Sequence, residues 1–362
     1  MILAGSISSI GHLGVFSSNE DGSPVLVTEK EYVCKDYPSL AAILEDFLDK
    51  HQLQEPLYAA CFGISGPVKS GLGKILSLKW ELTEGGLSEL LTKVAWNCQN
   101  AGDLHQSNKG MPVEVINSLG SIDPSNLEAK SEELVDLNLP SSNSSDMGES
   151  RHNCAAITVG RGIGEVLFYW DSFNNGFRAS PSEGGHANFA PRTQMEIDLL
   201  SYLLKRFTPV SYDQILSQRG LVNIYQFLKD TGRGKETAKE VTADAIIKEA
   251  LANPTDKNNL CTQALDLFVS ILGAEAGNLA LKYYALGGVY IGGVMVPGIV
   301  GKLRDGSFMA AFTDRENKAF ADLLATIPVK VVMNPKILLF GAAQRALDKE
   351  RMGKTLYAQC QK

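Results

Sequence analysis

Residues 182–191 read Ser-Glu-Gly-Gly-His-Ala-Asn-Phe-Ala-Pro, and this stretch is the most informative part of the chain. Glu183 and His186 stand three positions apart with two glycines between them. A carboxylate accepts hydrogen bonds from two hydroxyl groups, an imidazole donates or accepts another, and glycines let a ligand approach the backbone. The stretch therefore indicates a binding site for a polyol. Taken alone, it also fits a polar surface turn.

The composition excludes several classes of protein. The chain has 362 residues, enough for two domains, with 44% hydrophobic and 21% charged residues. Its net charge of −7 and the lack of a Lys/Arg cluster argue against a nucleic-acid partner. No apolar run reaches the roughly 18 residues of a membrane helix, and the chain starts with an apolar strand instead of a signal peptide. We therefore expect a cytoplasmic protein without a membrane partner.

The six cysteines occur singly, and no Cys-x-x-Cys pair is present. We interpret them as reduced thiols and expect no metal site built on them.

Hydrophobic periodicity predicts a mixed α/β fold. In the first part we predict a strand meander within 2–33, a helix at 37–53, and strands at 57–65 and 112–118. In the second part we predict a strand at 155–159, a glycine turn at 160–164 and a strand at 166–170. This second strand, turn and strand repeat the start of the chain, as a duplicated fold requires.

The remaining segments are mainly helical. We predict helices at 194–207, 212–229, 243–252, 260–284 and 337–351, and strands at 287–294 and 329–334. The acidic segment 127–139 is interpreted as helical, and 140–153 as a solvated loop whose role stays open.

The central stretch is followed by a helix and by Ile-Leu-Ser-x-x-Gly-Leu-Val-Asn-Ile-Tyr at 215–225. Together these segments resemble the sugar-binding region of the bacterial-type glucokinase family, and the resemblance extends from residue 2 to about 349. It implies an α/β, two-domain actin-like (ribonuclease-H-like) hexokinase fold with an interdomain cleft. Residues 1–120 plus 338–362 would form the small α/β domain, and 121–337 the large α/β domain with helical additions.

The resemblance also implies a set of hexose contacts. The matching positions are Asn117, Glu183, His186 and Asp213, the last one methylene shorter than the family's Glu. The family's catalytic base, an Asp, is replaced by Ser118. A serine hydroxyl is no base near neutral pH, and loss of a positioned base costs about 10²- to 10⁴-fold in rate. Without the resemblance, Asn117 and Ser118 would equally fit the polar end of a strand.

The nucleotide side departs further from the family. Its Asp-x-Gly-Gly-Thr turn, which holds phosphate and orients magnesium, corresponds here to a turn with Ser6, Ser8, Ser9 and Ile10. The positions that match its other nucleotide contacts are Gly160, Arg161, Gly162, Gly164, Gly292 and Gly293. Arg161 replaces a Thr, and it would either pair with a phosphate or occupy the phosphate's space. A Gly-x-Gly-x-Gly turn is also typical of a plain β-hairpin.

Three hypotheses follow. The first is a catalytically impaired member of the glucokinase family that binds glucose or a related hexose, with no metal and no certain cofactor. The second is an active kinase, which would need ATP and magnesium. The third is a scaffold subunit, for which a homodimer or a protein partner stays open. A sugar-responsive repressor is not expected, because such repressors need an N-terminal helix-turn-helix and a metal-binding cysteine cluster.

Overall fold

The computed structural model describes residues 1–20, 22–51, 53, 55–75, 77–95, 110–128, 131–138, 152–173, 175–238 and 240–360. The chain forms two compact units. Unit 1 comprises Met1–Ile122 and Lys336–Lys362, and unit 2 comprises Asp123–Pro335.

Unit 1 is built on a five-stranded sheet in the order β3-β2-β1-β4-β8. Its strands are β1 (Ile2–Ile7), β2 (Ile10–Ser18), β3 (Pro24–Val33), β4 (Ala59–Ile64) and β8 (Val113–Asn117). The first three are antiparallel neighbours, while β1, β4 and β8 run parallel. A smaller sheet consists of β5 (Val68–Lys69), β6 (Leu72–Ile75) and β7 (Trp80–Thr83).

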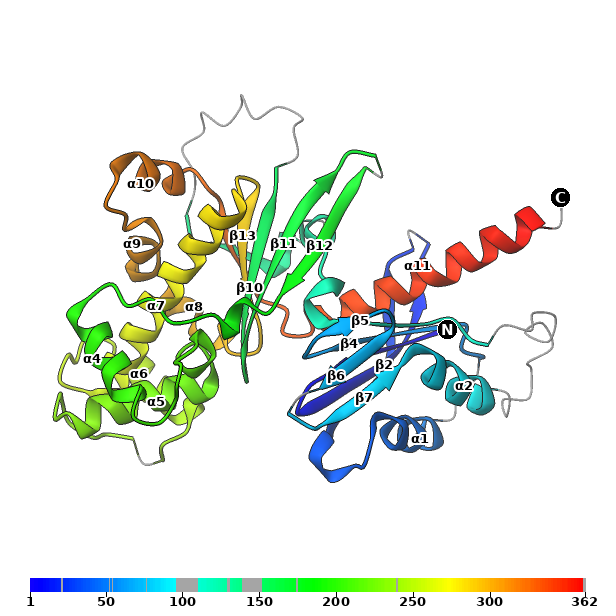
Figure 1. Ribbon diagram of the computed structural model, residues 1–362, viewed down its shortest axis with the longest axis horizontal. Coiled ribbons are helices and arrows are strands. Elements are labelled where there is room, and N and C mark those ends of the chain that lie inside the picture. Colours follow the sequence, from blue (N-terminus) through cyan, green and yellow to red (C-terminus); the bar gives the residue numbers. More distant parts are fainter. Residues whose placement is uncertain are drawn as a thin grey trace. The chain divides into compact units, whose positions relative to one another are not determined.

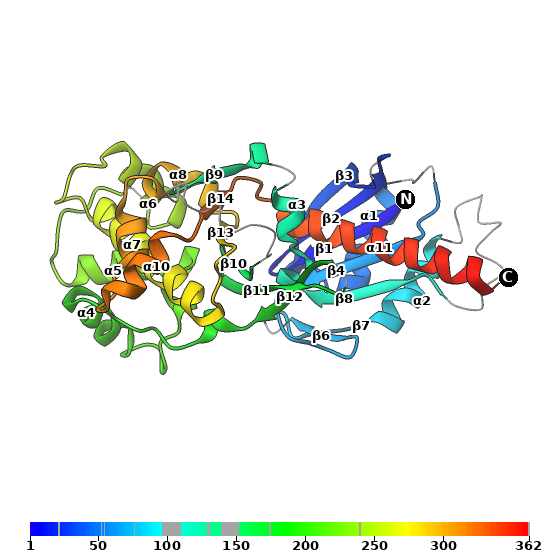
Figure 2. The same cartoon turned by 90° about the horizontal axis from the view of Figure 1, so that it is seen from above.

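Helices cover both faces of the five-stranded sheet. One face packs on α1 (Leu40–Lys50) and α2 (Glu84–Ala95), and the other on α11 (Ile337–Cys360), which Figures 1 and 2 show running along the strands. In α1 the buried residues are spaced three or four apart, and the Ser39 side chain accepts from the Ala42 N–H at the N-cap. In α11, Ala342, Ala343 and Ala346 allow close packing on β1 and β4. Short 3-10 helices lie at Cys34–Asp36 and Ser118–Ser121.

Unit 2 repeats this sheet. Its order is β12-β11-β10-β13-β14-β9, with β10 (Cys154–Val159), β11 (Ile163–Asp171) and β12 (Gly176–Ser182) antiparallel. β13 (Gly288–Gly292) and β14 (Val329–Val332) continue it in parallel, and β9 (Leu134–Asp136) closes the edge. A hairpin that feeds a parallel series occurs in both units, so the predicted duplication is confirmed.

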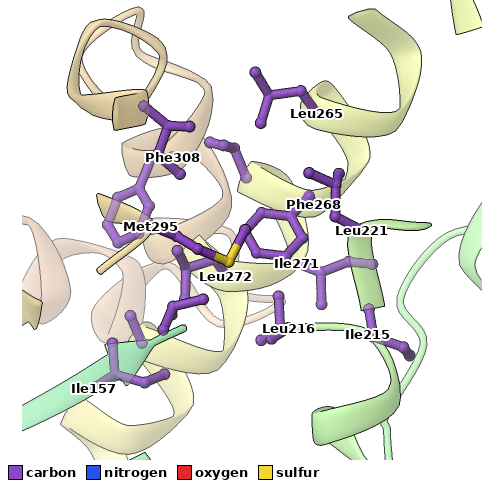
Figure 3. Close-up of a cluster of buried hydrophobic side chains, with 14 of the residues drawn as sticks. Ile157, Ile215, Leu216, Leu221, Leu265, Phe268, Ile271, Leu272, Met295 and Phe308 are labelled. Atoms are coloured by element: carbon purple, nitrogen blue, oxygen red, sulfur yellow. The ribbon is translucent and has the colours of Figure 1, made fainter. Parts of the chain in front are cut away.

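The helices of unit 2 gather on one side of its sheet (Figure 1). They are α4 (Gln194–Leu203), α5 (Gln218–Asp230), α6 (Ala243–Ala252), α7 (Leu260–Tyr283), α8 (Val296–Leu303), α9 (Ser307–Thr313) and α10 (Lys318–Ala325). A short α3 (Pro124–Glu128) and 3-10 helices at Ser131–Glu133, Gly184–His186 and Tyr212–Gln214 complete the unit. Figure 3 shows Phe268 and Leu272 of α7 packed beside Met295 in the core.

The central helix α7 is long and apolar enough to cross a membrane. However, 72% of its apolar window is buried inside the structure. It is therefore accounted for as the core helix of unit 2.

Two predicted elements are wrong in part. The predicted helix 212–229 starts as a 3-10 turn, and α5 begins only at Gln218, because the Ser217 hydroxyl group caps the Gly220 N–H. The segment 127–139 contains the strand β9, which pairs with β14, where we predicted helix. Its acidic residues lie on a sheet edge, where one side of a strand is solvated. The loop predicted at 140–153 lies outside the described residues up to 151.

Candidate functional site

The turn after β12 presents Glu183 and His186 to solvent. Their side chains are 52% and 63% exposed, and His186 Nε2 lies 3.9 Å from Glu183 Oε2. A 3-10 turn, Gly184–His186, holds them, with the His186 N–H donating to the Glu183 carbonyl and the Ala187 N–H to the Gly184 carbonyl. Two polar side chains thus share an accessible, hydrogen-bonded turn, and their role as hexose contacts stays a prediction.

The two glycines of this turn are required by what lies beneath them. A Cβ added at Gly184 would lie 2.1 Å from Glu165 Oε2, and one added at Gly185 would lie 2.5 Å from the Ile163 carbonyl oxygen. Real Cβ atoms do not come this close to other atoms. Glu165 and Ile163, both on β11, therefore lie directly beneath the turn, and the glycines allow this close packing.

The serine before the turn ties it to the same strand. Ser182 is the register partner of Glu165. Its hydroxyl group donates to the Glu165 carbonyl oxygen at 3.0 Å and accepts from the Gly184 N–H at 3.1 Å. The pairing of β11 with β12 and the two hydrogen bonds of the Ser182 hydroxyl group therefore hold the turn with Glu183 at a fixed distance from β11.

Glu165 is a buried acid that the sequence analysis missed. It is 2% exposed, and its Oε1 has no hydrogen-bond partner in the described part of the chain. Burial, with a smaller contribution from Glu275, raises its pKa to about 7, and Lys282 opposes this rise. The sequence shows Glu165 only as a single acid between Gly164 and the strand predicted at 166–170.

Asp213 lies in the same unit, where its carboxylate already has partners. It is 8% exposed, its Oδ2 accepts from Arg219 at 2.5 Å, and its Oδ1 accepts from the Ile163 N–H at 3.3 Å. These bonds connect the 3-10 turn at Tyr212–Gln214 to the start of β11. The role of Asp213 as a hexose contact stays a prediction.

The second glycine turn lies beside these residues. The Gly160 N–H donates to the Gly162 carbonyl, and the Gly160 carbonyl accepts from the Gln218 N–H at the start of α5. Gly293 has a φ of +101°, and a Cβ there would lie 2.4 Å from the Val159 carbonyl oxygen, so the Gly292-Gly293 pair packs on the end of β10. The structure therefore brings the predicted residues Gly160, Gly162 and Gly293 together, with Arg161 exposed at the turn.

Asn117 and Ser118 are in unit 1, where β8 ends. The Asn117 side chain accepts from the Leu119 N–H at 3.0 Å and donates to the Gly66 carbonyl at 3.2 Å, which fixes its amide group. Ser118 is 6% exposed, and its Oγ has no hydrogen-bond partner among the described residues. A Cβ at Gly63 of β4 would lie 3.1 Å from Ser118 Cα, so the glycine leaves room for this backbone.

Ser8 forms hydrogen bonds within the turn between β1 and β2. The Ser8 N–H and hydroxyl group both donate to the Ile10 carbonyl, each at 3.0 Å, and the Ile10 N–H reaches Ser8 Oγ at 3.4 Å. The Ser9 carbonyl accepts from the Cys34 N–H. The groups of Ser8 that could contact a ligand are thus used within the turn.

Comparisons with known proteins agree with this architecture. The Glucokinase family model matches residues 11–349. The chain belongs to the glucokinase family. A glucokinase of Nostoc sp. strain PCC 7120 is 30% identical over 337 residues, which cover 88% of this chain and 90% of the relative. A glucokinase of Synechocystis sp. is 31% identical over 343 residues, 88% of this chain and 89% of the relative.

A solved structure shows the same fold. The glucokinase of Balamuthia mandrillaris, crystallised in complex with glucose, superposes with a TM-score of 0.76 at 19% identity and covers 97% of this chain and 93% of that one. With the duplicated sheets, this assigns the chain to the actin-like (ribonuclease-H-like) hexokinase class of α/β folds.

The glucokinase family implies ATP and magnesium, and the residues of the first turn do not fit them. Ser6 offers a neutral hydroxyl group where magnesium prefers an anionic oxygen. The described residues contain no group of three His, Cys, Asp or Glu side chains able to hold a metal ion. The Ser8 N–H and hydroxyl group also donate within the turn, to the Ile10 carbonyl. We therefore derive no chemical step through bound magnesium.

Proposed function

We propose that this glucokinase-family protein binds glucose or a close hexose through Asn117, Glu183 and His186, and that it transfers phosphate slowly or not at all. The observation that carries the proposal is the contrast between these side chains and Ser118. Glu183 and His186 are exposed on a supported turn, while the residue beside Asn117 is a buried serine. We expect the protein to act in the cytoplasm.

The loss of activity follows from the chemistry of Ser118. Its Oγ has no hydrogen-bond partner in the described part of the chain, so no neighbouring base is in place to take its proton. A hydroxyl group that keeps its proton cannot accept one from an attacking sugar hydroxyl near neutral pH. The closed turn at Ser8 supports the same proposal on the nucleotide side.

An active ATP-dependent glucokinase is the second candidate. It is favoured by the family match over residues 11–349 and by relatives of about 30% identity that are glucokinases. In this case another carboxylate would have to serve as the base, and Arg161 would contact phosphate.

Two measurements on one preparation separate the candidates. Calorimetry with millimolar glucose tests hexose binding, and a coupled assay with ATP and magnesium tests turnover. Heat of binding without turnover supports the proposal, and robust turnover supports the second candidate. If neither binding nor turnover is observed, both candidates are overturned, and a scaffold role with a protein partner is left.

A further inference from the structure

We propose that Glu165 is a positioning residue for the hexose site: its buried carboxyl group supports the turn that carries Glu183 and His186, and this support depends on the carboxyl group being protonated. The inference rests on the proposed hexose binding, but one of its two tests needs no hexose.

The Glu165 carboxyl group lies directly against the turn. Its Oε2 occupies the space that a Cβ at Gly184 would need, so a side chain there would displace the carboxyl group. The Ser182 hydroxyl group links the Glu165 carbonyl to the Gly184 N–H. Any displacement of the Glu165 carboxyl group would therefore be transmitted to the backbone between Glu183 and His186.

The hydrogen bonds around Glu165 disfavour its ionised form. An ionised, buried carboxylate needs donors, yet Glu165 Oε1 has none among the described residues. The Gly184 N–H, a main-chain donor of the turn, already donates to the Ser182 hydroxyl group. An ionised Glu165 would gain partners only if the turn lifted and admitted water.

Charged residues of several elements lie near the Glu165 carboxyl group. From α7, Glu275 disfavours the ionised form and Lys282 favours it, while Lys282 is itself paired with Glu275 Oε1 at 3.0 Å. The turn that packs on β11 carries Glu183 and His186. Asp213, paired with Arg219, lies at the Ile163 end of β11. The register partners on the neighbouring strands, Ile157 and Ser182, are uncharged.

Burial holds the pKa of Glu165 near 7, so the carboxyl group changes its charge in the neutral range. The closed turn prefers the protonated form, and a hexose that binds the closed turn would stabilise that form. By linkage, hexose affinity should weaken as the pH rises through about 7.

The test is a set of calorimetric glucose titrations at about pH 6 and about pH 8 on wild type, Glu165→Gln and a surface control, Glu240→Gln. The neutral amide keeps the size of the carboxyl group but cannot ionise. We expect wild type and the control to bind glucose about three- to tenfold more weakly at the higher pH, and Glu165→Gln to lose this difference. His186→Asn, measured in parallel, removes the contribution of the imidazole. Equal pH dependence in wild type and Glu165→Gln would overturn the proposal.

A second arm needs no ligand. Hydrogen exchange of the His186 and Ala187 amides, which donate within the turn, reports its opening. After correction for the intrinsic rate, we expect their protection to fall between the two pH values in wild type and to stay constant in Glu165→Gln. If glucose does not bind but this difference appears, the hexose function fails and the supporting role of Glu165 holds. Unchanged protection in both proteins contradicts the role itself.

Discussion

Arg219 holds the carboxylate of Asp213 in an ion pair of 2.5 Å, and Asp213 stands where the family resemblance puts a sugar-binding acid. The Asp213 carboxylate is only 12% exposed, whereas Arg219 is 56% exposed. The arginine therefore competes with any ligand for Asp213 Oδ2. This competition can be tested directly by mutation of Arg219.

Arg219→Gln should tighten glucose binding, because Asp213 Oδ2 becomes free to accept from a sugar hydroxyl. A hydrogen bond to a charged group contributes about 1.5 to 3 kcal/mol, so about a tenfold gain in affinity is expected by calorimetry. Adding Asp213→Asn should abolish the gain. Unchanged or weaker binding in Arg219→Gln would show that Asp213 does not contact the sugar.

Gly184→Ala should destabilise the protein, because its Cβ would overlap Glu165 Oε2. Overpacking of this kind costs about 1 to 3 kcal/mol. The double variant Gly184→Ala with Glu165→Ala should recover most of the loss, measured by chemical unfolding as a double-mutant cycle. Gly298→Ala is the matched control, since a Cβ there meets nothing within 4 Å. Additive effects at 165 and 184 would refute direct contact.

Glu165→Gln should change how stability depends on pH. The folded-state pKa of Glu165, about 7, lies above the ordinary value of 4.5, so the folded state binds this proton more tightly than the unfolded state. The corresponding stabilisation is complete below about pH 4.5, declines as the pH rises to about 7 and is absent above it. Relative to wild type, the amide variant should gain stability across this window, and the gain should reach on the order of 3 kcal/mol above about pH 7. Parallel curves from thermal unfolding would contradict the assignment.

Glu183→Ala should remove most of the glucose affinity, because a carboxylate that can accept from two sugar hydroxyl groups is lost. Each such bond contributes about 1.5 to 3 kcal/mol. Glu183 is half exposed, so its removal should leave the melting temperature nearly unchanged. Glu240→Ala, an exposed acid outside the site, serves as the control for net charge. Equal glucose affinity in both variants would exclude Glu183 as a ligand.

The fold was largely predictable because its signals are local. The apolar strands Ile2–Ile7 and Cys154–Val159 each precede a short turn and a second strand, and this repetition predicts the duplicated sheet. The strand Leu134–Asp136 was not predictable, since its three residues become a strand only by pairing with β14, nearly two hundred positions later. Short edge strands depend on such tertiary partners more than on propensity.

In the candidate site, too, the sequence reveals local patterns but not the contacts between elements. Glu183, His186 and their glycines could be found in the sequence because they form a local pattern. The ion pair of Arg219 with Asp213 and the contact of Glu165 with Gly184 could not. The first depends on how α5 follows the 3-10 turn at Tyr212–Gln214, and the second on the pairing of β11 with β12. The raised pKa of Glu165 also depends in part on Glu275 of α7, which lies more than a hundred positions away.

Ser118→Asp tests which loss limits phosphoryl transfer. A carboxylate at this position would stand next to Asn117, whose amide is fixed by Leu119 and Gly66, and it would restore a base worth about 3 to 5 kcal/mol of barrier. That gain is of no use unless ATP is positioned. We therefore expect Ser118→Asp alone to stay nearly inactive in a coupled assay with glucose, ATP and magnesium.

Measurable phosphorylation should appear when Ser118→Asp is combined with a rebuilt first turn, Ser6→Asp, Ser8→Gly, Ser9→Gly and Ile10→Thr. Ser8→Gly removes the hydroxyl group that now closes the turn on Ile10, and Ser6→Asp supplies the anionic oxygen that magnesium prefers. The rebuilt turn with Ser118 kept is the matched control, because it should bind nucleotide without turnover. Robust activity of the wild type would contradict the impaired state. A folded combined variant without activity would instead point to Arg161, which would then occupy the space of the phosphate.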